Sequence, residues 1–352
     1  MMELEQIKTI LIDRVKKYDK DDIINPIDIQ LCADIHTLLS VILKHKKDDC
    51  YNLAEDKYID MLLKNNTLTV DLLVELFTEK TLNENYIYTT GNHRLSGSHT
   101  YHVFGNANVS VYHDSIVYAY NQAIVKTRQK ATLIAYDEVT FTASDDSVVY
   151  CDSTIGVNGD FYERTQGLLS NVHGKIRAYA NSKLTAIKCS QIEMYDKSTA
   201  EIRCGSKAKT MDKSQITCCY DAFVDAFDNS CIYAYGSSTV RMFNNSYGYF
   251  FDNSYCIADS ANEITAKDNS IVEAGQYVKF INAYNYSTIK IKEMGAKLRA
   301  YDNSIIEDYA DIYTNALNNA VIIWMNKHQI FKNQQKYSAE VPFDYTDEQK
   351  CQ

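Results

Sequence analysis

Residues 222–253 read AFVDAFDN, SCIYAYGS, STVRMFNN and SYGYFFDN, which are four versions of one eight-residue unit. The first residue of each unit is small, the third is mostly aliphatic, and the fifth is small or apolar. The unit ends in Asp, Asn, Gly and Ser, residues that form turns and tolerate left-handed backbone conformations. This stretch therefore predicts a short strand followed by a tight corner, repeated every eight residues.

The same unit extends over most of the 352-residue chain. Small residues recur every eight positions from Ala107 to Ala131 and, after Val139, at Ser147; a second array runs in strict register from Gly174 to Ser270. Positions one, three and five of these units hold no charged residue at all. Because 23% of the chain is charged, chance would leave all of these positions uncharged less than about once in a million. We therefore expect the three positions to point into a shared core.

Such units must stack, because one strand and one corner cannot bury an apolar face alone. We predict a parallel β-solenoid over residues 91–324 and, since the inward residues are small, about 16 residues per coil rather than about 24. The register is lost between Ser153 and Gly174, where residues 158–164 are predicted to form a loop. It slips by one residue on either side of Ser287. Residues 325–352 are predicted to fold back as a cap or to fray.

Residues 1–90 differ from the repeat and predict a small N-terminal helical bundle of four helices. Apolar residues recur at helical spacing from Leu4 to Val15, and Asn25-Pro26 offers a cap ahead of a second segment that runs to Ile42. Two shorter segments follow, at residues 51–63 and 70–78. This bundle contains 11 basic and 17 acidic residues. It is predicted either to cap the solenoid or to dock a partner.

The wording of the repeat, as in Ala300-Tyr-Asp-Asn-Ser304, resembles octapeptide-repeat parallel β-helix proteins of low-GC bacteria, Bacteroidetes and their phages. The resemblance covers residues 91–324. It implies the solenoid architecture and no particular chemistry, because such repeats serve as scaffolds, adhesins and inhibitors alike.

Composition argues against several classes of protein. The net charge is −10, so no direct DNA binding is expected, and no apolar run reaches the ~20 residues of a membrane span. The acidic start is not typical of a signal peptide, and the ten cysteines form no CxxC pair. We predict a cytoplasmic protein with reduced thiols, in the host cytoplasm if the chain is phage-encoded.

Motifs for catalysis and metal binding are also missing from the sequence. It contains no glycine-rich nucleotide loop, no catalytic-serine elbow and no zinc-binding helix motif. His99 and His102 have metal-ligand spacing, but no cysteine or carboxylate stands at a matching distance, so they are predicted to be solvated residues of the first coil. Asp228, Asp252 and Asp268 occupy the repeating corner, where turn formation explains them. We expect no enzymatic activity, no cofactor and no metal.

Outward positions two and four of the repeat hold the candidate binding residues. With two units in each coil, Tyr233 and Tyr249 stack on one face beside Tyr247, and we expect Arg241 and Asp225 near them. A contiguous aromatic patch on a surface of otherwise Lys, Glu, Thr and Gln is typical of a binding site. The predicted partner-binding residues are Phe223, Asp225, Tyr233, Arg241, Tyr247, Tyr249 and Tyr255.

The sequence favours a non-enzymatic interaction protein that binds, and inhibits or scaffolds, a macromolecular protein or protein–nucleic-acid complex. One form of this role is a phage counter-defence inhibitor of a host complex that acts on nucleic acid. Nine basic and four acidic residues lie between 175 and 213, against two basic and eight acidic between 214 and 275, and such belts can steer a partner. A carbohydrate-binding adhesin or virion component is the alternative, followed by a polysaccharide-cleaving β-helix enzyme. Handedness and oligomeric state stay open.

Overall fold

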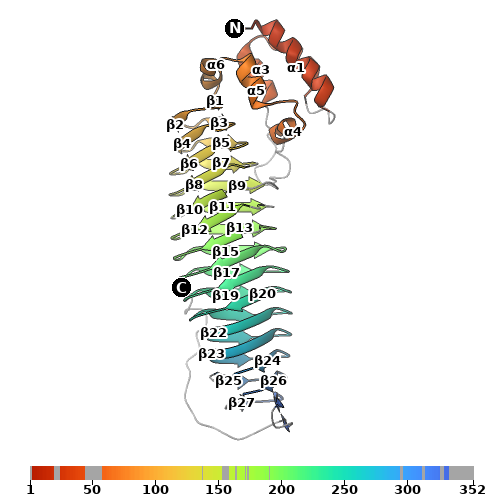
Figure 1. Ribbon diagram of the computed structural model, residues 1–352, viewed down its shortest axis with the longest axis vertical. Coiled ribbons are helices and arrows are strands. Elements are labelled where there is room, and N and C mark those ends of the chain that lie inside the picture. The colour runs from red at the N-terminus through yellow and green to blue at the C-terminus, as the bar shows by residue number, and fades with distance from the viewer. Residues whose placement is uncertain are drawn as a thin grey trace. The chain divides into compact units, whose positions relative to one another are not determined.

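Most eight-residue units form one short strand and one corner in the computed structural model (Figure 1), whereas β22 and β23 each run through two units. The structure describes residues 2–19, 24–43, 58–136, 138–152, 158–162, 165–170, 172, 174–189, 191–293, 296–310, 314–325 and 329–332. Short helices within residues 4–84 precede a parallel β-solenoid of about 14 turns over residues 87–323. The chain divides into two compact units, residues 1–158 and 159–352.

The helices of the first unit are short, and side-chain caps determine where several of them begin. Asn25, Thr69 and Thr78 each accept a hydrogen bond from a backbone N–H of the first turn. Asp34 does the same for Thr37 at 2.7 Å, which starts a new helix. The prediction of one helix from residue 26 to 42 was therefore wrong. The helices are α1 Leu4–Tyr18, α2 Pro26–Leu31, α3 Ile35–Ile42, α4 Tyr58–Lys64, α5 Val70–Leu76 and α6 Glu79–Glu84.

The last of these helices, α6, was not predicted, and residues 51–57 of the predicted third helix lie outside the described residues. None of the described helices is long and apolar enough to cross a membrane.

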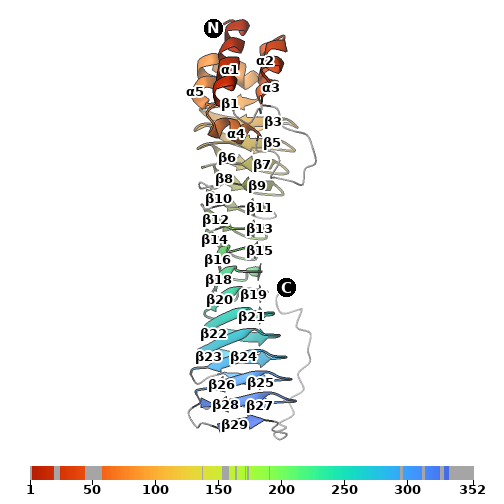
Figure 2. The same ribbon diagram turned by 90° about the vertical axis from the view of Figure 1, so that its right-hand side faces the viewer.

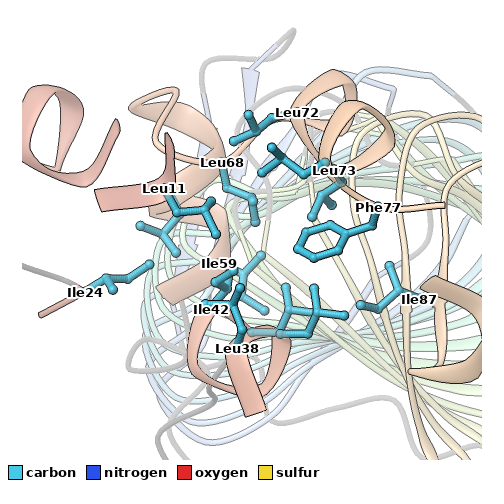
Figure 3. Packing of buried hydrophobic residues seen from close by; sticks show 14 of the residues in the cluster. Leu11, Ile24, Leu38, Ile42, Ile59, Leu68, Leu72, Leu73, Phe77 and Ile87 are labelled. Carbon is cyan, nitrogen blue, oxygen red and sulfur yellow. The ribbon is translucent and has the colours of Figure 1, made fainter. Parts of the chain in front are cut away.

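The helices share one apolar core with the first coils of the solenoid. Leu38, Leu73 and Phe77 lie in this core (Figure 3). Phe104, Tyr120 and Tyr136 from the solenoid belong to the same cluster, although they stand one residue past the ends of their strands. A small helical segment of this size gains most of its stability from such packing rather than from helix propensity.

The strands of the first unit form two parallel stacks. Each strand pairs with the next but one along the chain, so partners lie two repeat units apart, as Val109 and Val125 do. One stack contains β1 Ile87–Tyr88, β3 Thr100–Val103, β5 Ile116–Ala119, β7 Thr132–Ala135 and β9 Val148–Asp152. The other contains β2 Asn92–Ser96, β4 Asn108–Tyr112, β6 Ile124–Thr127 and β8 Thr140–Ala143.

The second unit has two stacks of its own, seen on the two sides in Figure 2. The β18 sheet contains β10 Asn158–Phe161, β12 Lys175–Ala178, β14 Gln191–Met194, β16 Lys207–Thr210, β18 Phe223–Ala226, β20 Thr239–Met242, the first parts of β22 Tyr255–Ala266 and β23 Ile271–Ala283, β24 Thr288–Ile291, β26 Ile305–Asp308 and β28 Val321–Trp324.

The β19 sheet contains β11 Gln166–Ser170, β13 Lys183–Ile187, β15 Thr199–Arg203, β17 Gln215–Cys218, β19 Cys231–Ala234, β21 Tyr247–Phe250, the second parts of β22 and β23, β25 Lys297–Ala300 and β27 Thr314–Ala316.

The coil length confirms the preference for two sheets. Partners lie two whole units apart along the β18 sheet from Ile192 to Val272, as Val224 and Val240 do. The next two coils, from Ile271 to Thr288 and from Thr288 to Ile305, are each one residue longer. These longer coils are the predicted one-residue slips.

The prediction of a loop at residues 158–164 was wrong, because Asn158–Phe161 is strand β10. Gly159 and Phe161 are both buried there, and Phe161 fills the space that a side chain at Gly167 would need. Gly159 at the third position and Phe161 at the fifth depart from the aliphatic-then-small pattern of the repeat, so the pattern did not predict this strand. Residues 163 and 164 lie outside the described residues.

The corners link successive coils through the Asp and Asn residues of the repeat. One residue in most corners has a positive φ, such as +56° at Asp196 and Asp252. The Asp196 carboxylate accepts a hydrogen bond at 3.0 Å from the backbone N–H of Ala180 in the preceding coil, and the N–H of Asp196 donates to Asp212 at 3.1 Å. The predicted role in turns is confirmed, but the bonding partner is the neighbouring coil rather than the residue's own turn.

The end of the solenoid reverses direction. Strand β29 Gln329–Lys332 pairs antiparallel with β28, so the chain folds back at this point. Folding back was one of the two outcomes predicted for this end of the chain, and fraying was the other. Residues 333–352 lie outside the described residues.

Candidate binding surface

The seven predicted partner-binding residues lie on two different sheets. Tyr233, Tyr247 and Tyr249 stand on β19 and β21 of the β19 sheet. The other four, Phe223, Asp225, Arg241 and Tyr255, stand on β18, β20 and β22 of the β18 sheet. Consecutive strands along the chain alternate between the sheets, so side chains one repeat unit apart face opposite ways. The expected position of Arg241 and Asp225 beside the tyrosines was therefore wrong.

The tyrosines of the β19 sheet form the predicted stack. The rings of Tyr233 and Tyr249 lie 5.0 Å apart and nearly parallel, and Tyr233 pairs along the sheet with Thr217 as expected. Tyr247 stands beside Tyr249 on β21, and its hydroxyl is hydrogen-bonded to Asn262. Tyr249 is only 8% exposed, whereas Tyr233 and Tyr247 are half-buried. The surface therefore presents mainly ring edges, because the ring faces contact one another.

A second column of aromatic rings runs beside this stack and was missed from the sequence. Tyr235 and Phe251, one residue past the strands, stack at 4.7 Å. The Lys267 ammonium continues the column, at 5.6 Å from the Phe251 ring and 5.7 Å from that of Tyr284. The sequence does contain a sign of this column, because an aromatic residue recurs at position six of the repeat, as in the Ala-Tyr-Asp-Asn motif.

Three of the four residues of the β18 sheet, Phe223, Asp225 and Arg241, form a connected group around one ion pair, and Tyr255 lies on the next strand of the sheet. Arg241 donates two hydrogen bonds to the Asp225 carboxylate, both at 2.6 Å, and its guanidinium lies 4.9 Å from the centre of the Phe223 ring. The bonds to Asp225 raise the pKa of Arg241. Burial and a hydrogen bond to Glu273 raise the pKa of Tyr255 to about 12. All four side chains are thus held in place by neighbours on the same sheet.

Position four of the β18 sheet carries charges that alternate in sign from coil to coil. Arg177 lies 3.3 Å from Asp160 in the coil before it and 3.7 Å from Glu193 in the coil after it. Like charges in register at the ~4.8 Å strand spacing would repel, so alternation favours the stacked arrangement. The predicted belts of one sign are not what this column presents. The column reads Asp160, Arg177, Glu193, Lys209, Asp225, Arg241, Ile257, Glu273, Lys290, Glu307 and Ile323.

Three aliphatic side chains of the same sheet are more exposed than the predicted aromatics. Ile257 is 40% exposed, Ile305 38% and Ile271 37%. They sit at outward positions, where isoleucine is an ordinary strand-forming residue, so the aromatic pattern of the sequence did not single them out.

The histidines and cysteines that were considered as metal ligands or nucleophiles pack against neighbouring side chains in the structure. His102 is buried and stacks on Tyr118 at 5.6 Å, so the expectation of a solvated residue was wrong for it; His99 stacks on Tyr86 at 4.6 Å. Within the described ranges, no group of three or more His, Cys, Asp or Glu residues is placed to hold a metal ion. Burial raises the pKa of the inward Cys218 to about 12, which disfavours a thiolate at neutral pH.

The corner carboxylates also have a structural partner. Asp252 accepts a hydrogen bond at 3.0 Å from the N–H of Gly236, and Asp228 and Asp268 hold the same position in their coils.

No family model, curated protein or solved structure matches this chain. The architecture is a β-solenoid, and the resemblance to octapeptide-repeat proteins of bacteria and phages stays a prediction at the level of family.

Proposed function

We propose that this protein is a non-enzymatic interaction protein that binds another protein through the aromatic surface of the β19 sheet. We define this aromatic surface as Tyr233, Tyr235, Tyr247, Tyr249 and Phe251. It combines two parallel ring stacks with an outer tyrosine. Tyrosine and phenylalanine supply large contact areas with few rotatable bonds, which is why they dominate the energetics of interfaces.

The observation that carries this proposal is the use of the same outward positions inside the first unit. There, Tyr118 and Ile134 stand at position four and Tyr120 and Tyr136 at position six, and all four pack against the apolar cluster of the helices. Tyr233 and Tyr249 hold position four, and Tyr235 and Phe251 position six, of their own units. The repeat thus already docks Leu- and Ile-rich helices on side chains of this kind. We infer a partner with a similar apolar helical surface.

Two features of the second unit favour a protein partner over a polynucleotide or a glycan. Nucleic-acid backbones are bound by sustained runs of Lys and Arg, whereas the column through Arg177 and Glu193 alternates in sign. A sugar that stacks on tyrosine needs an open ring face, and the faces of Tyr233 and Tyr249 contact each other. Inhibition or scaffolding of the bound protein, including a host complex that acts on nucleic acid, is the role we propose.

The test compares two triple variants with the parent protein. In the first, Tyr233, Tyr247 and Tyr249 are changed to Ser. In the matched control, Tyr162, Tyr179 and Tyr195 are changed to Ser, which removes three aromatic rings of the same unit that stack with spacings of 4.9 Å. Proteins captured by the parent from a lysate are identified by mass spectrometry. Each is then purified, and its affinity for the three proteins is measured by calorimetry.

The proposal expects a captured protein whose affinity falls at least about tenfold for the first variant and stays near the parental value for the control. Thermal unfolding of both variants shows whether the fold is kept. Equal affinity of the parent and the first variant for every captured protein would contradict the proposal. Glycan retention by the parent would favour the carbohydrate-binding alternative.

A further inference from the structure

The outward face of the β18 sheet has a regular pattern of charged and uncharged side chains that the proposed function does not involve. Its outward position four is the alternating charge column, and its outward position two is almost free of charge. From Phe223 to Val321, position two reads Phe, Thr, Tyr, Ile, Thr, Ile and Val over seven successive coils. An uncharged stripe beside a charged one has the composition of a protein interface, with an apolar core and a polar rim.

The charge column has an unusual symmetry about Ile257. Signs alternate from Glu193 to Arg241, and continued alternation would place a negative charge at 257 and a positive one at 273. The column instead has a neutral isoleucine at 257 and restarts with a negative charge at Glu273. One coil away from Ile257 the charges are therefore positive on one side and negative on the other.

Residues two and three coils before and after Ile257 are also opposite in charge. Two coils from Ile257, Asp225 is matched by Lys290. Three coils away, Lys209 is matched by Glu307. At every level up to three, the residue before Ile257 and the residue after it are opposite in sign. A column with this property is complementary to itself when its direction is reversed.

We propose that the β18 sheet binds the β18 sheet of a second copy of this chain, antiparallel, with a two-fold axis along the Tyr255–Ala258 strand segment. Such an axis reverses the order of the coils and keeps position four opposite position four. Arg241 then faces Glu273 of the other copy, Asp225 faces its Lys290, and Lys209 faces its Glu307. Symmetry doubles these three pairs to six.

The apolar residues support the same axis. The side chain of Ile257 lies on the axis and meets its own copy, and Ile271 faces Thr239. Ile257, Ile271 and Ile305 are 37–40% exposed in the single chain, so the contact removes apolar surface from water. At position two, the only charged residue within three coils of the axis is Lys207, which faces Ile305.

The extent of the face suits a reversible dimer. The two reversed sheets overlap over nine strand levels, from β14 to β28. At ~4.8 Å spacing and with strands ~13 Å long, these levels give roughly 550 Å² per copy, or about 1,100 Å² in total. That is near the lower limit of specific interfaces, so we expect dissociation in the micromolar range. The surface is distinct from the aromatic surface of the β19 sheet, and either proposal can fail without the other.

The first test is the oligomeric state of the full chain, measured by sedimentation velocity from about 1 to 200 µM. The proposal expects a concentration-dependent dimer that weakens in high salt. Ile257→Lys places two ammonium groups against each other on the axis and should weaken the dimer at least about a hundredfold. The matched control is Ile124→Lys, because Ile124 is also an outward strand isoleucine and is 39% exposed. A monomeric parent, or a dimer unaffected by Ile257→Lys, overturns the proposal.

The second test determines the orientation by disulfide cross-linking in a Cys204→Ser background, since Cys204 is an exposed thiol. Ile257→Cys should cross-link to its own copy. Ile305→Cys alone should not, but a mixture of Ile305→Cys and Lys207→Cys chains should. Self-cross-linking of Ile305→Cys as strong as that of Ile257→Cys would indicate a parallel arrangement and overturn the proposed axis.

Discussion

At the scale of the residue, inward positions three and five of one coil share a fixed volume. Most coils place an aliphatic residue at three and a small one at five, as Ile232 and Ala234 do. In the next coil of the same sheet the sizes are exchanged, with Gly248 and Phe250. A Cβ atom on Gly248 would lie 2.5 Å from the Phe250 ring, so the large residue occupies the space that the glycine leaves. The core therefore conserves volume per coil rather than residue type per position.

This exchange predicts a compensating pair of substitutions. Gly248→Ile alone overpacks the core, and Phe250→Ala alone leaves a cavity that costs about 3–5 kcal/mol. The double variant restores the Ile and Ala found in the neighbouring coils of the sheet, such as Ile264 and Ala266. Its free energy of unfolding, from denaturant titration, should lie closer to the parent than either single variant. Additive losses would show that the two side chains do not share one space.

At the scale of the element, each corner is stabilised by the coil that follows it. The Asp196 carboxylate accepts a hydrogen bond from the backbone N–H of Ala180 in the preceding coil, and Asp196 itself has a left-handed backbone conformation. The aromatic residues at position six stack in the same way, as in the Tyr162, Tyr179 and Tyr195 column with its 4.9 Å spacings. Because successive coils repeat at the strand spacing, identical side chains meet face to face, and this favours the high tyrosine content of the chain.

Substitutions at Asp196 separate the hydrogen bond from the backbone conformation. Asp196→Asn can keep both and should change the free energy of unfolding by less than about 0.5 kcal/mol. Asp196→Gly keeps only the left-handed backbone and should cost about 1 kcal/mol. Asp196→Ala loses both and should cost about 1 kcal/mol more than the Gly variant. Denaturant titration checks the order Asn, Gly, Ala; equal stability of the Ala and Asn variants would contradict the role of the corner.

At the scale of the whole molecule, the helices and the first coils fold around one core within residues 1–158. A Cβ atom on Gly105 would lie 3.4 Å from the Val70 side chain, which places the start of α5 against a corner of the solenoid. Phe104, Tyr120 and Tyr136 then serve as a buried ladder under the helices, with ring spacings of 4.9 and 5.1 Å.

Removing the central ring of this ladder should release the helices. Tyr120 is fully buried, and Tyr120→Ala should cost about 3–5 kcal/mol. Since the lost contacts belong to the helical core, amide hydrogen exchange should accelerate in α5 and change little in β18 to β21. Tyr179→Ala, which removes the central ring of a half-buried ladder outside this core, is the control. Unchanged exchange in α5 would contradict the docking role of Tyr120.

The sequence by itself determined the coil of this protein. Inward positions, corners, the period of two units per coil and its slips near Ser287 are local and periodic, so a pattern of apolar and turn-forming residues is enough to predict them. The local caps at Asp34 and Thr78 were present too, although the apolar period masked the helix break that they cause.

Only the tertiary structure decided which side chains share a surface. Two sheets face opposite ways, so Asp225 and Tyr233, one unit apart, are separated, while Asp225 and Arg241, two units apart, form an ion pair. The charge column around Ile257 and the ladder beneath the helices likewise join residues that are distant in sequence. The ladder depends on the docking of the helices, which leaves no period in the sequence. The charge column follows the period of two units per coil, but only the stacked coils show that its members and the tyrosines lie on different sheets.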